Sequence, residues 1–341
     1  MSEIKLNKPH GLYVSNREVF IADLHNHRVR KLLQNGQAVT IAGTGEQGYN
    51  GDGQLATDAQ LSGPIAVFVS SNDEVYISDY LGHRIRKILR DGTITTIAGT
   101  GVSGYSGDGG LAVNAQIDSC TGLFVTDDGE VYLCDFGNQR IRKIDRSGII
   151  STVAGTGAHG YNGDGISATQ AQLNNPMDLY VYKNEVYISD YSNSRIRKMD
   201  QDGIITTVAG TGVSGYNGDD QLATLANLYY PHSLVVEDDC ITFNDSENQR
   251  VRRVLADGTI QTIAGTGQKS ASTSNLTDVN TPTGLSIEKS QIYISDSLSR
   301  VCKIGPNGKI ETIAGSGVKG YSGDVPFDFN TNPHRGRGSK N

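Results

Sequence analysis

Six imperfect copies of one repeat make up this sequence, and they constrain the fold more strongly than any other feature. The string Ile-Ala-Gly-Thr-Gly or a close variant recurs at intervals of 50 to 56 residues, with its first glycine at Gly43, Gly99, Gly155, Gly210, Gly265 and Gly315. An aspartate that ends an apolar stretch, followed by an arginine, recurs in step with this string. Because the copies fill the chain, the sequence predicts a single domain over residues 1–341.

Each copy contains four short segments of strand character. In the second copy they span residues 65–69, 74–78, 84–88 and 93–97, and short turn sequences join the first pair and the last pair as antiparallel hairpins. Radial packing of such units leaves few exposed sheet edges, whereas a linear solenoid would need polar capping repeats that neither end shows. The sequence therefore predicts an all-β, six-bladed β-propeller of four-stranded antiparallel blades, spanning residues 9–46, 64–102, 120–158, 176–213, 231–268 and 282–318.

One segment carries a family resemblance. Residues 19–30 read Val-Phe-Ile-Ala-Asp-Leu-His-Asn-His-Arg-Val-Arg and resemble the NHL repeat. The Gly-Tyr-Asn-Gly-Asp-Gly sequence at 160–165 and the Ala-Thr-x-Ala-x-Leu sequence between blades are similar to those of bacterial, protist and teneurin-type NHL propellers. The resemblance covers nearly the whole chain and implies the NHL type of propeller. It implies no single function, because NHL propellers serve as protein scaffolds, RNA binders, sensor ectodomains and, in relatives, lyases.

Topology predicts which face of the ring can bind. The loop after each repeated aspartate and the long connector between blades share one face, here called the loop face, and the opposite hairpin face carries only tight turns. Binding is expected on the loop face. A residue present in every copy is expected to serve packing, and structural ion pairs are therefore predicted for Asp23 with Arg28, Asp79 with Arg84, Asp135 with Arg140, Asp190 with Arg195 and Asp245 with Arg250.

The connectors between blades repeat the pattern Gly-Tyr-x-Gly-Asp. A calcium loop needs several oxygen ligands and usually a closing glutamate, which these loops lack. We expect their aspartates to cap the turn that follows, with metal binding as the alternative, at Asp52, Asp108, Asp164 and Asp219. The same pattern returns after the last blade, so residues 319–330 are predicted to lie over blade 1 as a latch, followed by a disordered tail over 331–341.

Positions that differ between copies are the functional candidates. The residue after the repeated aspartate is apolar or aromatic in the first four copies and serine in the last two. Aromatic anchors on a rigid face suit a protein or peptide partner, and the predicted partner face comprises Tyr80, Phe136 and Tyr191 with His25, His27 and His83 beside them. The alternative is that these rings pack on neighbouring connectors. The favoured function is a non-enzymatic recognition scaffold.

The channel-lining positions offer an alternative function. His10, His232 and Asp178 stand where they could approach a common ligand on the axis, and the resemblance implies relatives that are metal-dependent lyases with metal in the channel. Only two of the six channel-lining positions hold histidine, and the apolar residues Ile65 and Met177 occupy two of the others. The sequence therefore predicts no cofactor, with a divalent metal and a lyase or hydrolase activity in the channel as the alternative.

Charge and composition narrow the partners. The chain has 30 basic and 37 acidic residues, so nucleic acid is not an expected partner, although RNA binding on the loop face stays a second alternative. No apolar run is long enough to span a membrane, and the N-terminus shows no secretory signal. The four scattered cysteines fit reduced thiols. We expect a monomeric domain, either cytoplasmic or part of a larger protein of unknown location.

Overall fold

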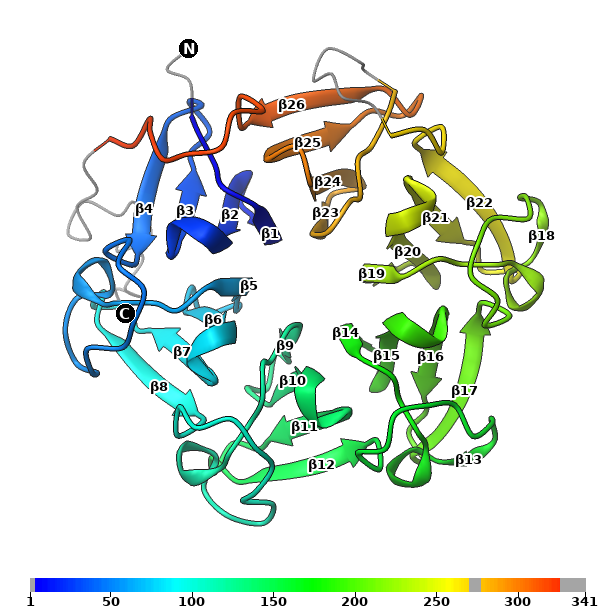
Figure 1. The fold of residues 1–341 in the computed structure, drawn as a ribbon, viewed down its shortest axis with the longest axis horizontal. Helices are drawn as coiled ribbons and strands as arrows, with labels where there is room; N and C mark the ends of the chain where they lie inside the picture. Colours follow the sequence, from blue (N-terminus) through cyan, green and yellow to red (C-terminus); the bar gives the residue numbers. More distant parts are fainter. Residues whose placement is uncertain (1–3, 270–276, 326–341) are drawn as a thin grey trace, which may run out of the picture.

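The computed structural model describes residues 4–269 and 277–325, and these form a closed ring of six blades (Figure 1). Each blade is an antiparallel sheet of strands that are consecutive in the sequence. The strands are, for blade 1, β1 (Pro9–Ser15), β2 (Glu18–Asp23), β3 (Arg28–Leu32) and β4 (Ala38–Ala42); for blade 2, β5 (Pro64–Val69), β6 (Val75–Asp79), β7 (Arg84–Ile88) and β8 (Ile94–Ala98); for blade 3, β9 (Leu123–Val125), β10 (Val131–Asp135), β11 (Arg140–Ile144) and β12 (Ile150–Ala154); for blade 4, β14 (Pro176–Tyr182), β15 (Glu185–Asp190), β16 (Arg195–Met199) and β17 (Ile204–Ala209); for blade 5, β19 (Pro231–Glu237), β20 (Cys240–Asp245), β21 (Arg250–Val254) and β22 (Thr259–Ala264); and for blade 6, β23 (Leu285–Glu288), β24 (Gln291–Asp296), β25 (Arg300–Ile304) and β26 (Ile310–Ala314).

The predicted all-β, six-bladed propeller is confirmed. The first strand of each blade lies at the centre of the ring and the fourth at its rim (Figure 1). The sheets of blades 4 and 5 each gain a two-residue outer strand from a connector, β13 (Ile166–Ser167) and β18 (Gln221–Leu222). In the described part of the chain no helix has the length and apolarity needed to cross a bilayer.

The hydrophobic core lies between adjacent blades rather than within one sheet. Val29 and Ile41 of blade 1 pack with Val67 and Ile77 of blade 2. The connector contributes its own apolar side chains to this layer, namely Ala56, Ala59 and Leu61. This position explains the repeated Ala-Thr-x-Ala-x-Leu sequence, because small residues let the connector approach the sheets and the leucine fills the space between them.

The glycine that opens each connector permits a close backbone approach. Gly43 has a φ of +95°, and a Cβ there would lie 2.2 Å from the carbonyl oxygen of His27. Only glycine fits such a position without moving the backbone. The turn therefore fixes the direction in which the chain leaves β4 toward the next blade.

Both ends of the chain build the connector that closes the ring. The amide of Gly320 donates to the carbonyl of Leu6 at 3.1 Å, as Gly48 donates to Leu61 at 3.2 Å within the first connector. Val325 donates to Ala38 at 2.8 Å, as Gly53 donates to Ile94. The described part of the predicted latch therefore lies on blade 1, and residues 326–330 of the latch and the tail 331–341 fall outside the described residues.

Candidate functional site

In blades 1, 3, 4 and 5 the repeated aspartate forms an ion pair, but not with the predicted arginine. It pairs instead with an arginine two residues further along the third strand of its blade, namely Asp23 with Arg30, Asp135 with Arg142, Asp190 with Arg197 and Asp245 with Arg252, at 3.1 to 3.7 Å. In blade 6, where Cys302 occupies that deeper position, Arg300 itself pairs with Asp296. The predicted pairings with Arg28, Arg84, Arg140, Arg195 and Arg250 are therefore wrong.

Burial explains the choice of partner. The deeper arginines, such as Arg142, are fully buried and need an anionic partner, because an unpaired buried charge is costly. The predicted arginines lie at the start of the third strand and are satisfied by main-chain oxygens. Arg84, for example, donates to the carbonyls of Gly82 at 3.0 Å and Thr100 at 2.9 Å.

The connector aspartates supply a second carboxylate to the same deep arginines. Arg86, Arg142, Arg197 and Arg252 lie 2.6 to 3.0 Å from Asp52, Asp108, Asp164 and Asp219 respectively. The short turns that follow these connectors have no side-chain cap, so the predicted capping role is wrong. The connector tyrosine packs over both the outer and the deep arginine, with the Tyr105 ring centroid 3.7 Å from the Arg140 guanidinium and 4.8 Å from that of Arg142.

Blade 2 departs from this network at one residue. Blades 1, 3, 4 and 5 place an asparagine three residues after the aspartate, and its amide donates to the carboxylate, as Asn138 does to Asp135 at 2.9 Å. Blade 2 has Gly82 there, and Oδ2 of Asp79 is buried without a partner in the described structure. Burial raises the pKa of Asp79 to about 7. The aspartates are thus structural, and burial is the largest cause of the raised pKa of each one, which its hydrogen-bond donors partly offset.

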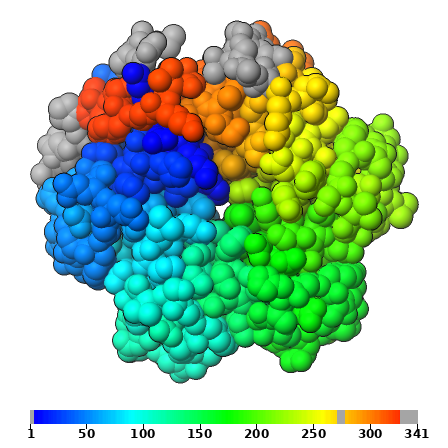
Figure 2. Space-filling model, viewed as in Figure 1, coloured from blue at the N-terminus to red at the C-terminus, as the bar shows by residue number. Residues whose placement is uncertain are grey.

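The predicted aromatic anchors lie on the loop face. Tyr80, Phe136 and Tyr191 each open a short 3-10 turn, η3 (Tyr80–Gly82), η5 (Phe136–Asn138) and η7 (Tyr191–Asn193), and each side chain is half-buried. These turns and the connectors face the viewer in Figure 1. The space-filling view shows that this face has only a narrow central opening (Figure 2).

Two of the three predicted histidines accept hydrogen bonds from the backbone that leads into the next blade. Nδ1 of His27 accepts a hydrogen bond from the amide of Gly63, and Nδ1 of His83 accepts one from the amide of Ser119, both at 3.1 Å. The equivalent Gln139 and Gln249 accept from the corresponding amides with their side-chain oxygens. His27 and His83 are therefore positioned for blade packing, whereas His25 is exposed on the loop face.

Sequence reasoning missed a stacked tyrosine pair beside the arc. Tyr191 and Tyr230 lie with ring centroids 4.5 Å apart and planes 7° from parallel, and Tyr229 and His232 contact the same pair. Tyr230 has a φ of +55°, which is unfavourable for a bulky side chain. The same position before the first strand holds Lys8, Gly63, Ser119, Asn175 and Thr281 in the other copies, so comparing copies at this position would have revealed it.

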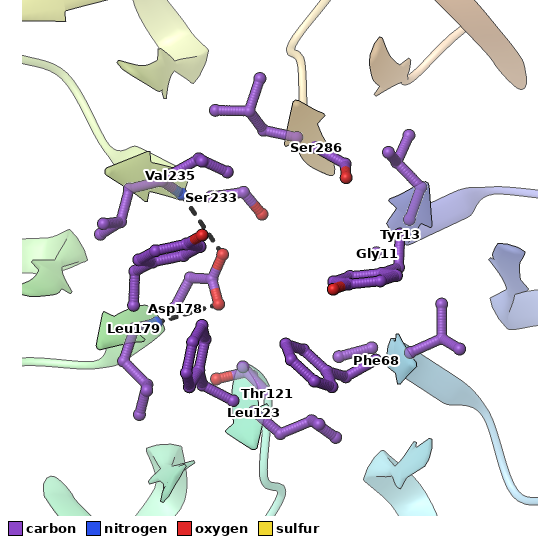
Figure 3. Close-up of a pocket in the computed structure, with 18 of the residues that line it drawn as sticks. Gly11, Tyr13, Phe68, Thr121, Leu123, Asp178, Leu179, Ser233, Val235 and Ser286 are labelled. Atoms are coloured by element: carbon purple, nitrogen blue, oxygen red, sulfur yellow. Dashed lines mark hydrogen bonds between the residues drawn. The ribbon is translucent and has the colours of Figure 1, made fainter. Parts of the chain in front are cut away.

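The three residues of the predicted channel site line one cavity of about 100 Å³ but do not form a metal site. The rings of His10 and His232 are 4.7 Å apart, and burial lowers the pKa of His10 to about 3 and that of His232 well below its usual value, so both are neutral. Both oxygens of Asp178 accept main-chain hydrogen bonds, from Leu179 at 2.9 Å and Leu234 at 3.3 Å (Figure 3). Within residues 4–269 and 277–325, no group of three histidine, cysteine or acidic side chains could hold a metal ion.

A second ring of side chains, also missed, lies one step further along the channel toward the hairpin face. Four neighbouring blades each contribute one aromatic residue, Tyr13, Phe68, Phe124 and Tyr180, which we call the aromatic collar. Successive ring centroids are 4.6, 5.1 and 4.8 Å apart. The collar opens onto a funnel of about 610 Å³ on the hairpin face. The loops of this face are tight turns, as expected, but the channel gives the face a hollow that the sequence analysis did not predict.

Comparison with known proteins places the chain in a family. Two family profiles match, described as the Teneurin NHL domain over residues 100–163 and the NHL repeat over residues 6–32. Teneurin-3 of Danio rerio is 28% identical over 298 residues, covering 74% of this chain and 11% of that protein. NHL repeat-containing protein 2 of Gallus gallus is 25% identical over 331 residues, covering 85% of this chain and 45% of that protein.

Solved structures share the fold at low sequence identity. A streptogramin B lyase structure superimposes with a TM-score of 0.56 and 12% identity, covering 96% of this chain and 88% of the other. The structure of a nidogen/laminin complex gives a TM-score of 0.58 and 14% identity, covering 87% and 92% of the two chains. These likenesses concern the fold alone. The family profiles, the sequence relatives and the repeat geometry together show that this chain is a six-bladed β-propeller of the NHL-repeat family.

Proposed function

We propose that this propeller is a recognition module whose loop face binds a protein or peptide segment. The observation that carries the proposal is the arc of half-buried rings formed by Tyr80, Phe136, Tyr191 and Tyr230, here called the loop-face arc. Partly exposed aromatic side chains on a rigid support lose little conformational entropy on binding, so they suit the anchors of an interface.

The side chain of Tyr230 supports the proposal. All six copies adopt the left-handed conformation at this position, including Lys8 at a φ of +56° and Thr281 at +41°, so the strained backbone belongs to the repeat. The tyrosine ring belongs to blade 5 alone, where it stacks on Tyr191, and packing alone does not require it at a position where five other copies manage without one. A binding role accounts for this residue.

The distribution of basic residues disfavours the RNA alternative. The deep arginines of the third strands are fully buried, and the outer ones donate to main-chain oxygens. They are therefore committed to the ring rather than available to phosphates. The metal-dependent lyase alternative gains no support from the channel, because the described residues hold no group of three histidine, cysteine or acidic side chains that could bind a metal ion. The nidogen/laminin complex is a protein assembly on the same fold, which agrees with a recognition role.

Replacing the three predicted anchors together tests the proposal. We expect Tyr80→Ala/Phe136→Ala/Tyr191→Ala to weaken binding by at least about 100-fold, because each buried anchor of an interface contributes on the order of 1–2 kcal/mol. Peptides selected on the immobilised wild-type propeller provide the ligands, and biolayer interferometry provides the affinities.

A control variant removes three apolar side chains outside the arc that are more exposed than the arc residues. The variant Val102→Ala/Val213→Ala/Leu225→Ala changes connector residues that are 57 to 60% exposed. We expect it to bind the selected peptides as the wild type does. Equal affinities of all three proteins would show that the loop-face arc is not the binding surface.

A further inference from the structure

We propose that the hairpin-face end of the channel binds an organic ammonium group, with the aromatic collar around the cation and Asp178 as its counter-charge. The ligand class is an alkylammonium ion, carried either by a small molecule or by a lysine-type side chain of a peptide. This site lies on the face opposite the loop-face arc and does not depend on the proposed function.

The collar has the composition and arrangement of a cation receptor. Its rings follow one another around four neighbouring blades with centroid separations of 4.6 to 5.1 Å. Phe68 is buried and the other three rings are half-buried, so they line the wall of the channel rather than the outer surface. The electron-rich faces of such rings attract a desolvated cation, and quaternary and alkylated ammonium groups suit them best.

Asp178 supplies an anion at the inner end of the collar. It lies on β14 two residues before Tyr180, and Figure 3 shows its carboxylate directed into the channel, with Tyr13 and Phe68 across from it. The lining of the cavity contains no lysine or arginine, and Asp178 forms no ion pair with any described residue. A buried carboxylate without a cationic partner is unfavourable, and burial accordingly raises the pKa of Asp178 to about 7.

Asp178 also breaks the repeat. The equivalent position is small in every other copy, with Gly11, Ala66, Gly122, Ser233 and Gly284. Gly122 of the neighbouring blade makes room for it, since a Cβ there would lie 2.3 Å from Oδ1 of Asp178. A costly charge placed in a cradle that fits it indicates a ligand-binding role rather than a packing role.

The mouth of the channel is negatively charged, as Asp178 is. Asp127, Asp128 and Glu130 line the funnel below the collar, where Asp128 pairs with Arg146 and Glu130 pairs with Lys143 at 2.9 Å. Asp127 and Glu288 act on the Tyr13 hydroxyl and Glu237 on that of Tyr180, and together with burial they raise the pKa of both phenols. Lys183, which also lines the funnel, is paired with Asp239 at 2.6 Å. Because these three ion pairs carry no net charge, Asp127 leaves the mouth with a negative charge that favours the approach of a cation.

The chemistry of the lining excludes other ligand classes. An anion would meet Asp178 and the acidic mouth. A neutral apolar ligand would gain nothing from Asp178 or from the acidic mouth. An ammonium group satisfies the rings and the carboxylate together, and the funnel of about 610 Å³ accommodates the chain that carries it.

Isothermal titration calorimetry with choline, and with its neutral isostere 3,3-dimethyl-1-butanol, tests the site. We expect choline to bind at least about 10-fold more tightly than the alcohol, because only the cation gains from the rings and from Asp178. Asp178→Asn should weaken choline binding at least about 10-fold, and Phe124→Leu, which replaces a ring by an aliphatic group, about 3-fold or more. Asp73→Asn, at an exposed hairpin turn of the same face, should leave binding unchanged.

The outcomes are distinguishable. A short peptide containing trimethyllysine, titrated in parallel, separates the two sources: tighter binding of the peptide than of choline assigns the site to a side chain, and the reverse assigns it to a small molecule. Absence of binding by both cations, or equal affinity for choline and the alcohol, would overturn the proposal. So would unchanged choline affinity in both Asp178→Asn and Phe124→Leu, provided that circular dichroism shows both variants folded.

Discussion

Replacing Arg142 by alanine should lower the free energy of unfolding by about 3–5 kcal/mol, the usual cost of leaving a buried charge without its partner. Arg142 is fully buried and lies 3.1 Å from Asp135 and 2.6 Å from Asp108. Its removal leaves Asp135, itself inaccessible to solvent, with only amide donors from Asn138 and the Asp118 backbone. Urea denaturation followed by circular dichroism measures the loss.

Arg140 provides the matched control on the same strand. It is two residues away, is partly exposed, and donates to the carbonyls of Asn138 at 2.8 Å and Thr156 at 2.7 Å. Those carbonyls can turn to water, so Arg140→Ala should cost only about 1 kcal/mol. Equal losses in the two variants would mean that the double-carboxylate network does not stabilise the ring.

Removing residues 316–341 should produce the second large effect, because it takes away half of the closing connector. Arg30 loses Asp324, to which its Nε donates at 2.9 Å, and Tyr321 no longer covers the Arg28 guanidinium, which lies 4.0 Å from the ring centroid. Breaking one buried charge contact and opening the ring should cost on the order of 3 kcal/mol or more. A scanning calorimeter should record a clearly lower unfolding midpoint.

Two further variants isolate the cause. Truncation after Val325 keeps every described contact of the closing segment and should melt with the wild type. Asp324→Asn should reproduce a substantial part of the loss, because it removes only the carboxylate that faces Arg30. If truncation after Gly315 leaves the melting midpoint unchanged, ring closure does not depend on this connector.

The repeat alone was sufficient to predict the architecture. Periodic motifs determined the number of blades, and turn sequences such as Arg90-Asp91-Gly92 separated the four strands of each one. The strand boundaries could also be predicted, because each strand is short and ends at a residue that recurs in every copy, for example Asp79 before η3. Local sequence and global fold agree here, so little tertiary information was needed.

The partner of each buried aspartate could not be predicted in the same way. Arg140 and Arg142 lie on the same face of one strand, and alternation does not show which of them reaches inward. One signal was present: the sixth copy lacks both the deep arginine, replaced by Cys302, and the Gly-Tyr-x-Gly-Asp connector before it, at 268–275. Their joint loss indicates that the two groups interact, as the structure shows for the other blades.

The candidate sites were predicted only in part. Tyr80, Phe136 and Tyr191 were found because they vary at a position adjacent to the repeated aspartate. Tyr230 and the aromatic collar were missed because their positions were not compared between copies. Predicting the collar also requires the position of each residue along the channel axis. Tyr13 and Tyr180 line the same cavity only because the blades close into a ring.

The substitution Tyr230→Gly tests most directly the central claim that residues departing from the repeat serve binding rather than packing. Glycine suits a φ of +55°, so the melting midpoint should stay the same or rise. Affinity for the peptides selected on the wild type should fall at least about 10-fold, as for an interface anchor. A lower melting midpoint with unchanged peptide affinity would contradict the account and make Tyr230 a packing residue.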